Sequence, residues 1–130
     1  KVEISSNFQL SVKSNRVAVE SIISNLIDNA IEHGKTDTEI LVNLGVNSSS
    51  NVYLRVTNKV GTEVNEDDLK HMFEPLWQKD ASRTSEDNFG LGLSIVDALC
   101  DAVCAEVSVT KTAEEDISFL LTFKNETIGP

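Results

Sequence analysis

The chain of 130 residues has few cysteines, prolines and aromatic residues, and it has no long apolar run. Its two cysteines, Cys100 and Cys104, give neither a zinc-ligand framework nor a disulfide scaffold, so we interpret them as reduced core thiols. No run approaches the roughly 18 apolar residues of a membrane span, and no signal-peptide pattern opens the sequence. The chain starts without methionine in a strand-like segment, and we expect residues 1–130 to be one domain excised from a longer protein.

Basic residues are also scarce, with 11 lysines and arginines against 21 acidic residues and a net charge of −10. Nucleic acids and anionic membranes both require a basic patch, so neither is expected as a partner. The same charge disfavours a bare polyphosphate. A bound nucleotide is therefore expected to come with a divalent cation and a local cluster of positive charge.

Hydrophobic periodicity divides the chain into strands and helices. Because the strands alternate, helices can cover one face of a sheet, and this predicts an α/β fold: a two-layer sandwich with a mixed sheet. The expected elements are two short strands within 1–13, a helix capped by Ser14 or Asn15 and ending at Gly34, a hairpin of 40–46 and 52–56, a short helix over 65–73, a helix over 90–103, and a closing hairpin over 107–123.

The helix within residues 20–34 combines an apolar stripe with two asparagines. Asn25 and Asn29 are four residues apart and are expected to project together from a face other than the apolar one. Helix interiors do not favour asparagine, so two in register indicate either a platform of amide oxygens for a ligand or a solvated face with accidental spacing. The predicted buried stripe is Ile23, Leu26, Ile27, Ala30 and Ile31.

Two glycines, Gly90 and Gly92, precede a second apolar helical run. Glycine lets the backbone approach a ligand closely, and a helix N-terminus offers free N–H groups and a positive dipole end to phosphate. Joined to the asparagine helix and to Phe-Glu-Pro-Leu at 73–76, this order resembles the ATP-binding domain of the sensor histidine kinases, a branch of the GHKL ATPase superfamily. The helix is similar to the family's N box, 73–76 to its F box and 88–93 to its second glycine box.

This resemblance covers nearly the whole chain and implies a fold and a function. The fold is the GHKL sandwich, with helices on one face of a mixed sheet. The function is to present Mg-ATP for phosphoryl transfer to a histidine on a separate dimerisation domain of the same parent, with a response regulator downstream. ATP and Mg²⁺ are the implied cofactors. The implied location is cytoplasmic, without direct membrane contact by this domain; whether the parent is anchored in the inner membrane is left open.

The resemblance also implies the site residues. Asn29 supplies an amide oxygen to Mg²⁺, and Asn25 supports the same ion or a phosphate. In the gyrase and chaperone branches a glutamate at the position of Asn25 activates water, whereas an amide has no useful basicity, which favours transfer to another nucleophile. The catalytic residues are Asn25 and Asn29; the nucleotide-binding residues are Asn25, Asn29, His33, Asn58, Gly61, Lys79, Arg83, Gly90, Leu91, Gly92 and Leu93.

The two histidines, His33 and His71, are not followed by the acidic residue that is typical of the family's phosphoacceptor. We therefore expect the phosphoacceptor on another domain. His33 either packs near the phosphates or simply ends its helix, and His71 is interpreted as a surface residue. Lys79 and Arg83 lie in the stretch that resembles the ATP lid, where they reach the phosphates or remain solvated.

Three positions depart from the family pattern: Asn58, Glu32 and Asn88. Asn58 stands where the first glycine box has an aspartate that binds the adenine amino group, and only Gly61 follows as a glycine. An amide oxygen accepts the same bond at a loss of about 1 kcal/mol; alternatively Asn58 is a loop residue with positive φ. Glu32 would repel a triphosphate, whereas Asn88 tolerates positive φ.

Two further interpretations stay open from the sequence. A degenerate domain would keep the sandwich as a docking module without enzymatic activity, as the altered first glycine box allows. An anti-sigma-type protein-serine kinase shares the fold, but it usually keeps an acidic residue near the position of Asn25.

Overall fold

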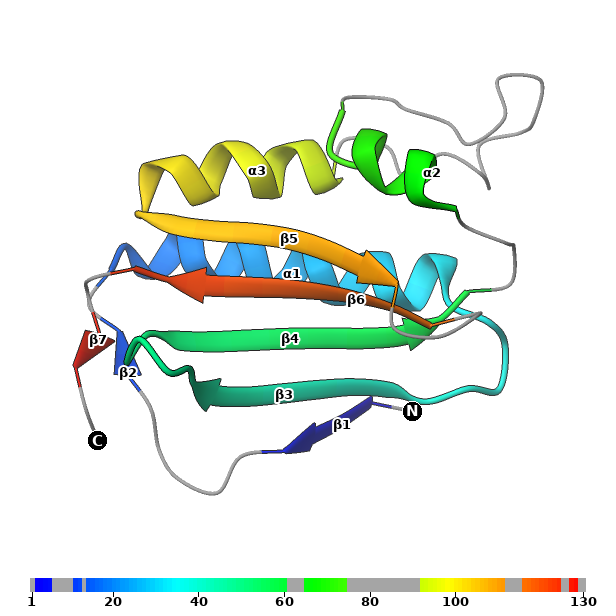
Figure 1. The fold of residues 1–130 in the computed structure, drawn as a ribbon, viewed down its shortest axis with the longest axis horizontal. Helices are drawn as coiled ribbons and strands as arrows, with labels where there is room; N and C mark the ends of the chain where they lie inside the picture. Colours follow the sequence, from blue (N-terminus) through cyan, green and yellow to red (C-terminus); the bar gives the residue numbers. More distant parts are fainter. Residues whose placement is uncertain are drawn as a thin grey trace.

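The computed structural model describes residues 2–5, 11–12, 14–60, 65–74, 92–111, 116–124 and 127–128. Three helices and seven strands lie in these segments (Figure 1). In chain order they are β1 (Val2–Ser5), β2 (Ser11–Val12), α1 (Arg16–His33), β3 (Ile40–Val46), β4 (Val52–Lys59), α2 (Glu66–His71), α3 (Gly92–Ala102), β5 (Ala105–Lys111), β6 (Asp116–Phe123) and β7 (Thr127–Ile128).

The main sheet has five strands in the order β1-β3-β4-β6-β5. β1 is parallel to β3, and the other neighbours are antiparallel, so the sheet is mixed. Helices α1 and α3 pack against each other, with α1 behind the central strands and α3 next to β5 (Figure 1). The predicted two-layer α/β sandwich is confirmed. Among the described residues, no helix is long and apolar enough to cross a membrane.

The ends of α1 follow from local chemistry. The side-chain oxygen of Asn15 accepts a hydrogen bond from the backbone N–H of Ala18 at 3.0 Å, which satisfies one of the first-turn donors. At the other end, a Cβ on Gly34 would lie 2.4 Å from the carbonyl oxygen of Ala30, so only glycine fits there. The predicted cap and end of this helix are both confirmed.

The buried face of α1 differs from the predicted stripe. Ile22, Leu26 and Ala30 are fully buried, whereas Ile31 is 59% exposed, so its assignment to the core was wrong. Asn29 is only 8% exposed, so it lies on the buried side rather than on a separate polar face. The reason is that α1 packs against both β4 and α3, so the side chains of α1 that face these two elements are the buried ones.

The two cysteines occupy different environments. Cys100 is buried in the core, and its burial, followed by the nearby Asp97 and Asp101 carboxylates, raises its pKa to about 11. Cys104 is exposed, so the prediction that both thiols lie in the core was wrong. It follows the end of α3 with φ of 57°, the left-handed conformation that commonly ends a helix.

Cys104→Gly is expected to stabilise the fold by about 0.5–1 kcal/mol, because glycine adopts positive φ without a Cβ clash. Urea denaturation of the two chains measures the difference, and Cys104→Ala is the control because it removes the thiol and keeps the Cβ. An equal gain from both variants would assign the effect to the thiol instead of the backbone.

Candidate nucleotide-binding site

Asn25 presents its amide oxygen to the start of α3. Its Nδ2 donates to the backbone oxygen of Ser21 at 2.8 Å and lies 3.3 Å from the Ser21 hydroxyl. Because a carbonyl only accepts, this bond fixes the amide nitrogen toward Ser21 and turns Oδ1 away. A Cβ built on Gly92 would lie 3.3 Å from that oxygen, so Asn25 Oδ1 faces the first residue of α3. Sequence reasoning missed Ser21, although it stands one helical turn before Asn25.

The first turn of α3 supplies donors at the same place. The first N–H groups of a helix have no intrahelical partner and lie at the positive end of the dipole. Gly92 is half-buried and has no side chain to block approach, whereas the Leu93 side chain is fully buried in the core. Leu93 therefore offers a ligand its backbone and not its side chain.

Asn58 carries an unusual buried oxygen. It lies within β4 and is 3% exposed, so the alternative of a loop residue with positive φ was wrong. Its Nδ2 donates to the backbone oxygen of Lys59 at 3.2 Å, but its Oδ1 has no hydrogen-bond partner among the described residues. A buried acceptor without a donor costs about 1–3 kcal/mol, and a donor on a ligand would remove that cost.

The end of α1 is tied to the end of β4 beside Asn58. Lys35 N–H donates to the same Lys59 oxygen at 2.8 Å, and Gly34 forms a β-bridge with Val60. A Cβ on Gly34 would lie 3.6 Å from Asn58 Nδ2. The Asn58 amide therefore adjoins the last turn of the helix that also carries Asn25 and Asn29.

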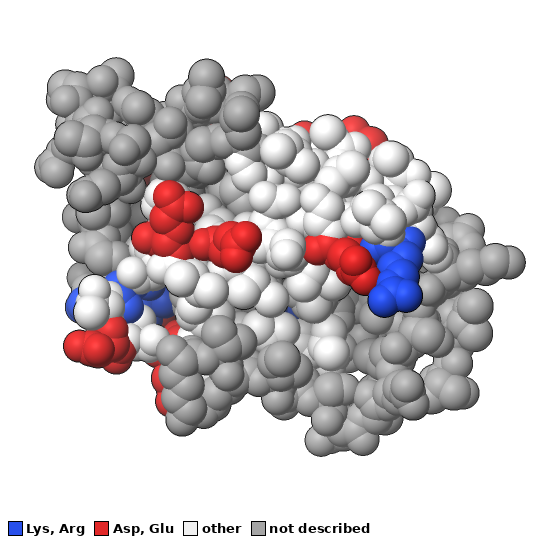
Figure 2. All heavy atoms as spheres, turned by 180° about the vertical axis from the view of Figure 1, so that it is seen from behind, with Lys and Arg blue, Asp and Glu red and all other residues white. Residues whose placement is uncertain are grey.

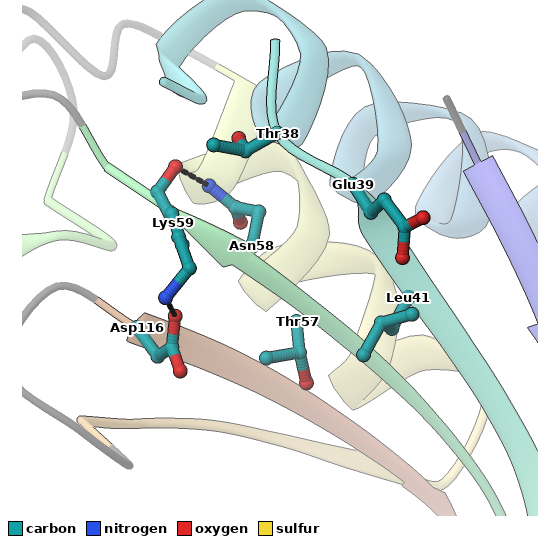
Figure 3. A pocket seen from close by; sticks show the side chains of 7 residues that line it. All are labelled: Thr38, Glu39, Leu41, Thr57, Asn58, Lys59 and Asp116. Carbon is teal, nitrogen blue, oxygen red and sulfur yellow. Dashed lines mark hydrogen bonds and ion pairs between the residues drawn. The ribbon is translucent and has the colours of Figure 1, made fainter. Parts of the chain in front are cut away.

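A cavity of about 280 Å³ adjoins Asn58. Figure 3 shows the Asn58 side chain next to Thr38, with its amide nitrogen turned to the Lys59 backbone oxygen, and the Thr57 side chain on the other side of the strand. An ion pair between Lys59 Nζ and Asp116 Oδ1, 3.0 Å apart, forms part of the lining. The lining residues come from the α1–β3 loop and from three strands; they are Thr38, Glu39, Leu41, Thr57, Asn58, Lys59 and Asp116.

Comparison with known proteins assigns the chain to a family. Residues 14–127 match the family described as histidine kinase-, DNA gyrase B- and HSP90-like ATPases. The chain belongs to this family. The family membership that the asparagine helix and the glycine box predicted is thereby confirmed.

The similar proteins are named as sensor proteins or sensor histidine kinases. The chain is 31% identical to the sensor protein VanSC of Enterococcus gallinarum over 120 residues, which is 87% of this chain and 32% of that protein. It is 30% identical to the heme sensor protein HssS of Staphylococcus haemolyticus over 110 residues, 85% of this chain and 23% of that protein. The chain therefore spans about a third or less of the length of these relatives.

Solved histidine kinase structures share the fold. Full-length ShkA in complex with AMPPNP superimposes with a TM-score of 0.78 at 21% identity, covering 99% of this chain and 27% of that one. The nucleotide-free catalytic domain of ThkA gives 0.72 at 21% identity, covering 94% of this chain and 75% of that one. At these identities the likeness shows the fold alone.

Within this ATPase-family chain, α1 acts as a spacer between two groups of polar atoms. Asn25 faces the start of α3 from the middle of α1, and His33, eight residues later, is half-buried in the last turn of α1, about 12 Å along the helix axis. Asn29 lies between them, and Asn58 lies beyond the helix end. The structure thus places three of the predicted residues, Asn25, Asn29 and His33, on α1 and the fourth, Asn58, on β4 beside the end of that helix. Gly61, Lys79, Arg83, Gly90, Leu91 and Asn88 lie outside the described residues.

The described helix layer offers little positive charge for a phosphate. Figure 2 shows acidic side chains across this layer, and Asp28 and Glu32 of α1 are both exposed. The single arginine of α1, Arg16, is paired with Glu20 at 2.8 Å. No cluster of three or more histidine, cysteine or acidic side chains suited to a metal occurs among the described residues.

His71 lies at the end of α2, as a partly exposed residue, in agreement with its interpretation from the sequence. Its Nδ1 is 2.5 Å from Oε2 of Glu74, which belongs to the stretch resembling the F box. The hydrogen bond to Glu74 is the main cause that raises the pKa of His71. This contact ties the end of α2 to the residue before Pro75.

Proposed function

We propose that this domain binds Mg-ATP along α1 and transfers its γ-phosphoryl group to a histidine on a dimerisation domain of the same parent protein. The observation that carries the proposal is the buried oxygen of Asn58 at the end of α1, which has no partner among the described residues, together with the oxygen of Asn25, which faces the start of α3 from the middle of α1. The first fits the amino group of adenine, and the second lies where donors for a phosphate are available. Membership in the ATPase family supports this assignment, as do relatives that are named as sensor proteins or sensor histidine kinases.

Each residue has a role in this proposal that its chemistry allows. Asn58 accepts a hydrogen bond from the adenine amino group. Asn25 and Asn29 direct hard amide oxygens to Mg²⁺, which takes few protein ligands when phosphates supply the rest. Bound Mg²⁺ neutralises phosphate charge, an effect needed in a chain with a net charge of −10.

Other residues of the proposal complete the phosphate side. His33, in the last turn of α1 near Asn58, contacts the nucleotide between its base and its phosphates, and the backbones of Gly90, Leu91, Gly92 and Leu93 approach the phosphates. Gly61 lets the backbone approach the base, while Lys79 and Arg83 add the positive charge that α1 lacks. Since no carboxylate occupies the position of Asn25 to activate water, the nucleophile comes from the partner domain. We place the domain in the cytoplasm, upstream of a response regulator.

The experiment mixes the domain with Mg-ATP labelled at the γ-phosphate and with the separately made histidine-bearing helical domain of the parent protein. Label in an acid-labile, base-stable form on that domain is the expected result. Label released to water indicates an ATPase, and label on serine indicates the protein-serine kinase. Calorimetry with Mg-ADP is the companion measurement, and an absence of heat at millimolar ligand would leave only the docking module.

A further inference from the structure

The Asn58 side chain differs from an aspartate in carrying a donor as well as an acceptor. In the structure the donor is engaged weakly, since Nδ2 lies 3.2 Å from the Lys59 backbone oxygen, at the long end of N–H···O bonds. The acceptor, Oδ1, is buried and has no partner among the described residues. In this state the amide presents an acceptor to a ligand and matches a base with an amino group.

The surroundings of Asn58 allow its side-chain amide to rotate by about 180°, which exchanges the positions of Oδ1 and Nδ2. The Lys59 oxygen keeps a shorter bond, to the Lys35 N–H at 2.8 Å, when the Asn58 donor leaves it. The neighbouring Gly34 has no side chain; even a Cβ there would stand 3.6 Å from Nδ2, so the amide has space to tilt away from the Lys59 oxygen. After rotation by about 180°, Nδ2 occupies the place of Oδ1 and presents a donor, while Oδ1 takes the place of Nδ2 and has to tilt away from the Lys59 oxygen, because both oxygens only accept.

We propose that Asn58 makes the base site permissive for 6-oxo purines as well as 6-amino purines. This rests on the proposed function, because it assumes that the base lies at Asn58. The 6-oxo base receives a hydrogen bond from Nδ2 in the rotated state, at the loss of the long bond to Lys59. One neutral hydrogen bond corresponds to a preference of about tenfold for the 6-amino base. An aspartate at this position has no donor and would turn its charge toward the 6-oxo group.

The test compares three magnesium-bound diphosphates by calorimetry on the unaltered chain: ADP, inosine diphosphate and purine riboside diphosphate. ADP and inosine diphosphate share the same ring skeleton; inosine carries an oxygen in place of the amino group at position 6 and a hydrogen on N1, and purine riboside carries no substituent at position 6. We expect inosine diphosphate to bind within about tenfold of ADP, and purine riboside diphosphate to bind more weakly than both.

The variant Asn58→Asp sharpens the comparison. It is expected to widen the gap between ADP and inosine diphosphate to at least about a hundredfold, because a carboxylate cannot donate. The matched control is Asn43→Asp, the same exchange at a half-buried position of β3, which should leave the ratio unchanged. Far-UV circular dichroism checks that each variant folds. If Asn58→Asp does not fold, the order of the three ligands on the unaltered chain decides.

The outcomes separate this inference from the function on which it rests. If ADP binds and inosine diphosphate binds more than a hundredfold more weakly, the Asn58 amide does not rotate. This result overturns the inference, while the proposed function stands. Equal affinity for all three ligands shows that Asn58 does not contact position 6 and also overturns it. No binding of any ligand overturns the proposed function and the inference together.

Discussion

Asn29→Ala is expected to lower the affinity of the domain for Mg-ADP by about 10- to 100-fold, because under the proposed function its amide oxygen ligates the ion. The fold should survive. Alanine is the best helix former, and Asn29 lies in the interior of an 18-residue helix whose buried contacts come mainly from Ile22, Leu26 and Ala30. Calorimetry measures the affinity, and far-UV circular dichroism measures the helix content of the same sample.

The dependence on magnesium distinguishes a ligand role from a packing role. Chelating the metal should weaken ADP binding to the unaltered chain and change little in the variant, because the variant has already lost the contact to the ion. Asp28→Ala is the matched control: it removes a neighbouring oxygen-bearing side chain from the exposed face of the same helix. Unfolding of Asn29→Ala, or an unchanged response to magnesium, would show that the 8%-exposed Asn29 serves the core instead.

Sequence reasoning located the helices and strands well where the signal was local. The alternation of Ile40, Val42 and Leu44 sets the buried face of β3 whatever its partners, and the Asn15 cap acts within one turn. The prediction that Ile31 is buried was wrong because its burial depends on where α3 packs against α1. The hydrophobic period of a single helix carries no information about that packing. The pairing of β2 with β7 was not predicted, since strands of two residues show no period.

The candidate site was predictable in part for the same reason. The spacing of Asn25 and Asn29 identified the helix that carries both amides. The extension of β4 through Asn58 to Lys59 was not foreseen, because the glycine of the family pattern suggested a loop. The cavity beside Asn58 joins Thr38 to Asp116, residues brought together by the pairing of β4 with both β3 and β6. Contacts between residues so far apart in the chain cannot be predicted from local sequence patterns.

Phe119→Ala is expected to lower the free energy of unfolding by about 3–5 kcal/mol, the largest stability loss that we predict. Phe119 is fully buried at the centre of the sheet, opposite Val56 on β4 and Val109 on β5. Native domains are stable by only about 5–15 kcal/mol, so this variant should approach unfolding at ambient temperature. Urea denaturation with a constant m-value measures the loss. The control is Leu120→Ala on the opposite face of β6, where Leu120 is only half-buried, and it should cost less than half as much.

Phe119→Leu distinguishes what Phe119 contributes by filling the core from what it contributes by its aromatic contact with Phe73, in the stretch that resembles the F box. The Phe119 and Phe73 rings meet edge to face, with centroids 6.1 Å apart and planes at 90°. Leucine fills most of the volume and removes this pairing, so we expect a loss of about 0.5–1.5 kcal/mol. If Phe73 holds the start of the segment after α2 through this ring, the leucine variant should also bind Mg-ADP more weakly. Unchanged affinity would assign Phe119 to the core alone. A loss of affinity with nearly full stability would link the centre of the sheet to the nucleotide site.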